Sequence, residues 1–137
     1  MTQQAFTDYI FAALIKRFPA FQLAEMSAAT SIQEIHCRSK QKKITLWLST
    51  ADKEITLGFA GDTSNDWHTH MNLSGAQTPE AELEAAIRYI EAIVENKQMI
   101  IHSTVYGYFP GDAEDLANSQ KHRQEQEHIQ TFYWKDL

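Results

Sequence analysis

The sequence predicts an α+β domain. Lys43–Ser49 and Glu54–Ala60 each alternate apolar with polar residues, which is the period of a strand with one buried face. Between residues 78 and 97, apolar residues recur every three or four positions, which is the period of an amphipathic helix. Strands and helices occupy separate stretches of the chain, so we expect an antiparallel sheet with helix 78–97 packed on one face.

A helix is expected at the N-terminus. Its shared apolar face would consist of Phe6, Ile10, Ala13 and Leu14. Pro19 should end this helix near Phe18, because proline lacks an amide hydrogen and disfavours a helical conformation in the preceding residue. A short second helix is expected around Phe21–Met26.

The two alternating strands are expected to form a hairpin around the turn Thr50–Lys53. In that register apolar residues oppose one another in the pairs Leu48 and Ile55, Leu46 and Leu57, and Ile44 and Phe59. A shift by one residue would turn one strand's apolar set to the opposite face, so burial selects this register. With Ile32–Arg38 before the hairpin and an extended Trp67–Leu73 after it, we expect a meander of three to four strands.

Helix 78–97 has clear signals at its start. Thr78 is suited to the N-cap and Pro79 to the first helical position. The residues expected to face the sheet are Leu83, Ala86, Ile87, Ile90, Ile93 and Val94. The helix should stop around Asn96–Lys97.

Two C-terminal strands are expected. Gln98–Phe109 is rich in β-branched and aromatic residues, and His128–Lys135 alternates. Gly111–Glu127, which separates them, is polar and lacks a sustained apolar period, so we expect a long loop with at most one helical turn.

Length and composition indicate a single domain, residues 1–137, in a reducing compartment. A chain of 137 residues can bury a core without a staple. Cys37 is the only cysteine, which excludes an internal disulfide, and we expect a cytoplasmic protein. No stretch approaches the roughly 20 apolar residues of a membrane span.

The charge distribution argues against a nucleic-acid partner. Residues 1–50 carry six basic and three acidic side chains, whereas the remainder carries fifteen acidic and six basic ones, for a net charge of −6. Nucleic-acid binders gather positive charge on one face. An acidic surface instead favours solubility or a basic protein partner.

His68 and His70 form the closest pair of metal-capable side chains. Residues two apart in a strand project to the same side, so the pair could share a zinc ion. Zinc needs three or four ligands, however. The candidates for further ligands are His36, His102, Asp62 and Asp66. The structural alternative is that the imidazoles only make hydrogen bonds and packing contacts, and we expect no cofactor.

Other polar clusters predict no catalytic residue. A glycosidase pair needs burial to separate two carboxyl pKa values, whereas Asp112, Glu114 and Asp115 lie in a polar stretch, as do Glu125 and Glu127. We expect solvated loops that could steer a basic partner. The remaining small features are Gly58, Gly61 and Gly75, expected in turns or bulges, and Cys37, expected in the core.

Three segments together resemble a family of small bacterial proteins. They are Gly58-Phe59, the run Asp66-Trp67-His68-Thr69-His70-Met71, and the helical stretch 84–94, which match the patterns G-F, [YW]-H-T-H-[FM] and E-A-x3-[FY]-I-x2-I. Some members resemble immunity proteins of polymorphic-toxin and contact-dependent growth inhibition systems. The final segment, residues 131–134, departs from the aromatic-glycine pattern of that family.

The resemblance implies a non-enzymatic cytoplasmic protein that binds and neutralises a toxin domain. A basic nuclease would suit the acidic balance of the chain. The residues expected to contact it are Asp62, Asp66, Trp67, Asp112, Glu114 and Asp115. The alternative is a metal-binding module or metal-dependent enzyme that uses His68 and His70.

Overall fold

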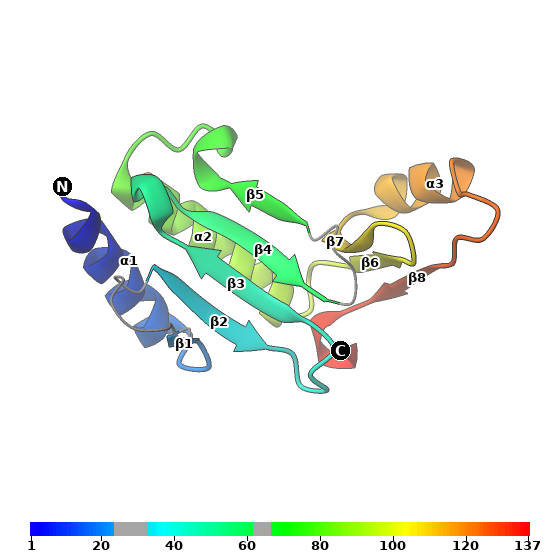
Figure 1. The fold of residues 1–137 in the computed structure, drawn as a ribbon, viewed down its shortest axis with the longest axis horizontal. Coiled ribbons are helices and arrows are strands. Elements are labelled where there is room, and N and C mark those ends of the chain that lie inside the picture. The colour runs from blue at the N-terminus through cyan, green and yellow to red at the C-terminus, as the bar shows by residue number, and fades with distance from the viewer. Residues whose placement is uncertain (24–32, 62–66) are drawn as a thin grey trace. The chain divides into compact units, whose positions relative to one another are not determined.

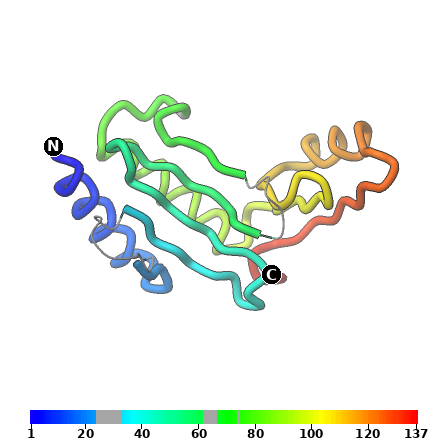
Figure 2. Tube along the Cα trace, viewed as in Figure 1, coloured from blue at the N-terminus to red at the C-terminus, as the bar shows by residue number. Residues whose placement is uncertain are grey.

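The computed structural model describes residues 1–23, 33–61 and 67–137, drawn in colour along the chain trace in Figure 2. Its helices and strands are α1 (Gln3–Arg17), β1 (Gln22–Leu23), β2 (Glu34–Arg38), β3 (Thr45–Ser49), β4 (Thr56–Ala60), β5 (His68–His70), α2 (Pro79–Val94), β6 (Ile100–Ser103), β7 (Gly107–Pro110), α3 (Ala113–Lys121) and β8 (Ile129–Phe132). Within these residues, no helix combines the length and the apolar character needed to cross a membrane.

The α+β class is confirmed. Five strands form one sheet in the order β1-β2-β3-β4-β5, so this sheet follows the chain as a meander (Figure 1). The last strands do not join it as expected, because β7, β6 and β8 form a second antiparallel sheet with β6 in the centre. The expected meander is therefore present, and the C-terminal strands make a sheet of their own.

Residue contacts divide the chain into two compact units. Unit 1 comprises Met1–Cys37, Leu46–Gly58 and His68–Arg88. Unit 2 comprises Arg38–Thr45, Phe59–Trp67 and Tyr89–Leu137. Strands β2 to β4 and helix α2 contribute residues to both, so each unit is described below through its own contacts.

Helix α1 in unit 1 ends where it was predicted to end. The Thr2 hydroxyl caps the helix by accepting the N–H of Ala5 at 3.1 Å, and the helix ends one residue before Phe18. The buried stripe differs slightly from the expected one, since Phe11 is buried and Ala13 only half-buried. The buried residues are Phe6, Thr7, Ile10, Phe11 and Leu14.

The short helix expected at Phe21–Met26 is wrong where the structure describes it. Gln22 and Leu23 form strand β1, which pairs with β2. Residues 24–26 lie outside the described residues. Pairing with β2 gives the backbone groups of these two residues hydrogen-bond partners. Tertiary context therefore overrides local propensity here.

The apolar faces of β3 and β4 form the centre of the core, as expected. All six predicted residues are at most 1% exposed, namely Ile44, Leu46, Leu48, Ile55, Leu57 and Phe59. The connection is longer than the four-residue turn predicted, because a 3-10 turn at Ala51–Lys53 separates strands that end at Ser49 and resume at Thr56. Asp52 and Lys53 both adopt positive φ there.

The extended segment expected at Trp67–Leu73 is shorter in the structure. Strand β5 stops at His70, and a 3-10 helix follows over Met71–Ser74. Gly75 ends that helix at φ 87°, a left-handed conformation that glycine adopts without steric cost. Met71 is fully buried, so the change of direction brings an apolar anchor into the core.

Helix α2 begins as predicted and ends slightly early. The Thr78 hydroxyl accepts the N–H of Ala81 at 3.1 Å, which is the expected N-cap bond. The helix stops at Val94 because Asn96 turns the chain at φ 62°. Its buried apolar residues are Leu83, Ala85, Ala86, Ile90 and Ile93, whereas Ile87 and Val94 are half-buried.

The single strand expected at Gln98–Phe109 is wrong, because unit 2 forms the hairpin β6–β7 there. The Ser103 hydroxyl turns the chain by accepting the N–H groups of Val105 and Tyr106 at 3.0 and 3.1 Å. Gly107 follows at φ 77°. A serine side chain that bonds nearby backbone offers an alternative to a straight ladder, and the continuous β-rich composition hides this turn.

The long loop expected at Gly111–Glu127 is also wrong, because residues 113–121 form helix α3. Asp112 and Asp115 form a capping box: each side chain accepts the other residue's N–H, at 2.8 and 2.9 Å. All but two residues of the helix are exposed. The sequence does not predict α3, because a polar helix on the surface has no apolar stripe whose period could be recognised.

The final strand is shorter than the expected His128–Lys135. Strand β8 stops at Phe132, and a 3-10 turn over Trp134–Asp136 follows. The Asp136 carboxylate accepts the N–H of Tyr133 at 2.9 Å, which fixes this turn. Trp134 and Leu137 are buried by the change of direction.

Glu127 is buried, contrary to the solvated loop expected around it. It is 2% exposed, and its carboxylate accepts hydrogen bonds from the Ser103 hydroxyl and from the N–H of Gln124. The Ser103 bond is the main cause that lowers the pKa of the Glu127 carboxyl, and the Gln124 bond adds to it. The ionised form therefore holds the chain after α3 against the β6–β7 turn.

We predict that Glu127 stabilises the fold at neutral pH and not in acid. A carboxyl whose folded pKa is lowered contributes stability above its unfolded pKa of about 4.3, and the contribution is lost as pH falls through the folded pKa. In urea unfolding, Glu127→Gln should be less stable than wild type at pH 7, and the difference should shrink in acid. Glu125→Gln, which removes an exposed charge nearby, is the control. A difference independent of pH would contradict the prediction.

Candidate functional site

The predicted site residues fall into separate parts of the structure. Asp62 and Asp66 lie outside the described residues. His68 and His70 belong to unit 1, whereas Trp67 and the acidic residues at 112–115 belong to unit 2. Two regions can therefore be described, one on the five-stranded sheet and one at the start of α3.

The first region is the polar side of the sheet in unit 1. Strand β5 pairs with β4 so that His70 lies opposite Thr56 and His68 opposite Gly58. Leu57, between these two positions on β4, is fully buried. Because neighbouring residues in a strand point to opposite faces, both histidines point away from the core, as their two-residue spacing predicts.

Trp47 lies on this face over Gly58. A Cβ atom added to Gly58 would come within 2.2 Å of the indole ring, which no real side chain tolerates. The indole is also beside His68, with 6.5 Å between ring centroids. Gly58 is thus not the turn or bulge glycine expected from the sequence; it lies inside β4 and makes room for the indole.

His36 extends the row on the other side of Trp47. The Thr50 N–H donates to the Gln33 carbonyl, and the Ser39 N–H donates to the Ile44 carbonyl. These two bonds, one at each end of the β2–β3 pair, imply the same antiparallel register. In that register His36 lies opposite Trp47. One row of side chains therefore crosses four strands, and we call it, with the polar residues next to it, the Trp47 face: Glu34, His36, Trp47, Glu54, Thr56, Gly58, His68 and His70.

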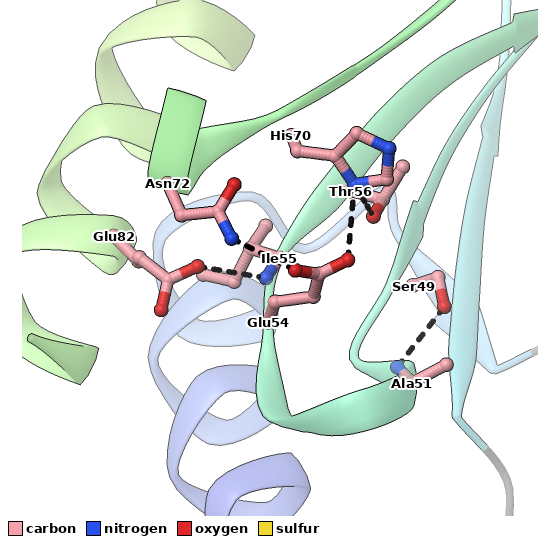
Figure 3. Close-up of polar contacts among 8 residues, drawn as sticks. All are labelled: Ser49, Ala51, Glu54, Ile55, Thr56, His70, Asn72 and Glu82. Atoms are coloured by element: carbon pink, nitrogen blue, oxygen red, sulfur yellow. Dashed lines mark hydrogen bonds and ion pairs between the residues drawn. The ribbon is translucent and has the colours of Figure 1, made fainter. Parts of the chain in front are cut away.

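Carboxylates hold two of the imidazoles on this face. Glu34 Oε1 lies 2.6 Å from His36 Nε2, and Glu54 Oε1 lies 3.1 Å from His70 Nδ1. The second oxygen of Glu54 accepts the amide of Asn72 at 2.9 Å (Figure 3). These bonds fix the rings while about a third or more of each paired side chain stays exposed, at 41% for His36 and 34% for His70.

The contacts of His70 do not form a charge-relay triad. The Thr56 hydroxyl lies 2.9 Å from Nδ1, the same nitrogen that Glu54 approaches (Figure 3). A relay needs the acid and the hydroxyl on opposite ring nitrogens, so that the ring can take a proton from one while the other orients it. What the arrangement does is orient the ring and leave Nε2 on its far side.

The same geometry bears on the metal hypothesis. A carboxylate at one imidazole nitrogen is the usual way to orient a histidine that binds a metal through the other. Across the described ranges, however, no three His, Cys, Asp or Glu side chains are grouped to hold an ion. His36 is paired with Glu34, and His102 stacks on Tyr108 in unit 2 at 4.3 Å between centroids.

Glu82 supports the start of β4 beneath this region. It is 7% exposed, and its carboxylate accepts the N–H of Ile55 at 3.0 Å (Figure 3). The carbonyl of Ile55 accepts the N–H of Met71, as in a strand pair. The chain turns into a 3-10 helix at Met71, however, so the N–H of Ile55 is bonded by the Glu82 side chain instead of by a backbone carbonyl. No local pattern in the sequence indicates this role for Glu82, because its strand partner is far away in the chain.

The second region is the exposed acidic start of α3 in unit 2. Asp112, Glu114 and Asp115 are all exposed. The N–H of Asp115 is the main cause that lowers the pKa of the Asp112 carboxyl, which favours the charged form of this group. The capping box thus fixes two of the three carboxylates on a rigid helix end instead of a loop.

Two further residues have mainly packing roles. Trp67, expected to contact a partner, is half-buried in unit 2, with its ring 5.1 Å from Phe59 and 6.2 Å from Tyr89 between centroids. Cys37 is buried, and burial raises the pKa of its thiol, which disfavours the reactive thiolate.

We predict that Gly58→Ala destabilises the protein through Trp47. The added Cβ must displace the indole, and overpacking of this kind costs about 1–3 kcal/mol. In the Trp47→Ala background the same glycine substitution should cost much less, which a double-mutant cycle of urea unfolding measures. Equal costs in both backgrounds would show that the indole does not lie on Gly58.

We predict that Asp112→Ala loosens α3. The substitution removes the side chain that accepts the N–H of Asp115, so hydrogen exchange of amides in the first turns of α3 should become faster. Asp112→Ser, which retains an N-cap acceptor, should restore most of the protection. Glu114→Ala, outside the capping bonds, is the control. Unchanged exchange in Asp112→Ala would contradict the capping role.

Searches against protein-family models, curated proteins and solved structures found no match to this chain. A functional proposal must therefore rest on the two regions described above and on the resemblance of the sequence motifs.

Proposed function

We propose that this protein is a non-enzymatic cytoplasmic immunity protein that binds and neutralises a cognate toxin domain with a basic surface. The observation that carries the proposal is the exposed acidic start of α3. Its carboxylates belong to a capped helix, so little conformational entropy is lost when a partner binds them. The H-T-H motif and the net charge of −6 support the same reading.

Charge at such a surface acts mainly on recognition. Complementary charges accelerate encounter and disfavour partners of like charge, and both effects weaken as salt screens them. Glu114 is the residue best suited to test this contribution. It is exposed, and it is not a member of the capping box formed by Asp112 and Asp115.

The alternative function is metal binding by His68 and His70. It is favoured by the Glu54 contact, which orients His70 through Nδ1. Any further ligands would have to come from outside the described residues or from a partner. Elemental analysis of protein purified without a histidine tag tests it: a zinc, iron or copper content near one equivalent supports the alternative, and less than about a tenth of an equivalent rejects it.

We predict that co-expression with the protein encoded by the adjoining reading frame protects cells from that protein's toxicity. Glu114→Lys should weaken the purified complex about tenfold, or roughly 1.4 kcal/mol, with most of the loss in the association rate. Glu80→Lys, the same charge reversal at the exposed start of α2, is the matched control. Absence of both toxicity and binding at low ionic strength would reject the proposed function.

A further inference from the structure

The Trp47 face has the features of a docking surface. Within the described part of unit 1, its exposed and half-exposed side chains form a row across strands β2 to β5. The Trp47 indole is half-buried, with the glycine beneath it and His68 beside it. A rigid aromatic ring of this kind supplies a large contact area and loses little conformational freedom on binding.

The charge of this face selects the partner. Glu34 lies on β2 and Glu54 just before β4, each against a histidine of the face, and the unit 1 positions on this side of β2 to β5 include no lysine or arginine among the described residues. Arg38, the next residue of the same alternation on β2, belongs to unit 2 and donates to the Lys42 carbonyl. A cation placed over the indole would gain from the ring's negative face and from both carboxylates.

Glu34 and Glu54 can still accept a cation, although each already contacts a histidine. Glu34 and Glu54 are held by imidazoles, and their own side chains remain 42% and 30% exposed. Their positions are thus fixed by histidines, and no ion pair joins them to a lysine or arginine in the part of the chain that the structure describes. The guanidinium group suits this arrangement best, because it stacks on aromatic rings and binds carboxylates through two donors at once.

We infer that the Trp47 face is the docking surface for an extended, arginine-bearing segment of a protein partner, with an arginine stacked on Trp47 between Glu34 and Glu54. This rests on the proposed function, which requires a basic protein partner. It adds a second contact surface, of defined chemistry, to the acidic start of α3.

A peptide titration tests the inference without the toxin. The probe is a short capped peptide in which threonine and arginine alternate, because threonine favours the extended conformation. In two-dimensional NMR, the peptide should shift the indole N–H resonance of Trp47 and the amides of β3 to β5. The matching peptide with glutamate in place of arginine should produce no shift. Binding of the arginine peptide should weaken with salt.

Substitutions on the face locate the binding. Trp47→Ala should weaken peptide binding about tenfold or more, and Glu34→Gln and Glu54→Gln should each weaken it several-fold. Trp47→Phe retains an aromatic ring and should retain part of the affinity, which separates a lost contact from a lost fold. Glu80→Gln, an exposed carboxylate outside the face, should leave it unchanged.

The results separate this inference from the proposed function. It is overturned if the arginine peptide fails to shift these resonances at low salt, if the glutamate peptide binds equally, or if the face substitutions have no effect. If a single-stranded oligonucleotide shifts the same resonances and the peptide does not, the face binds nucleic acid and the inference is wrong. Toxin capture and protection of cells test the proposed function alone.

Discussion

The strict alternation of β3 and β4 is the constraint on which the rest of the structure depends. It places Leu46, Leu48 and Leu57 on a face from which water is excluded, and therefore turns Trp47 and Gly58 to the other face. A shift of one residue in either strand would bury polar side chains and expose leucines, at a cost of several kcal/mol. The alternation that makes the core thus also assembles the polar face, on which Glu34 and Glu54 then orient two of the histidines.

Polar groups at the ends of elements complete the fold where the ladder of strands stops. Glu82 supplies the bond that Ile55 cannot obtain from Met71, Ser103 turns the β6–β7 hairpin, and the capping box begins α3. Each contact satisfies a backbone group that burial or a helix end would leave unpaired.

The two proposed contact regions would attract a partner through different interactions. At the start of α3, charge is exposed and strongly hydrated, so it can steer a partner and contributes modestly to affinity. At the Trp47 face, an aromatic ring shares one side of the sheet with two carboxylates, so a cation bound there would gain from the negative face of the ring as well as from Coulomb attraction.

The sequence by itself determined the α+β class, the end of α1, the start of α2, and the buried faces of β3 and β4, because periodicity, proline and capping residues act locally. It also placed His68 and His70 on one side of a strand. Only the tertiary structure decided that Gly58 lies under Trp47, that His36 joins their row, that Glu82 and Glu127 are buried, and that β6 to β8 form a separate sheet. These features arise from contacts between residues distant in the chain, and no local pattern records which distant partner a side chain will meet.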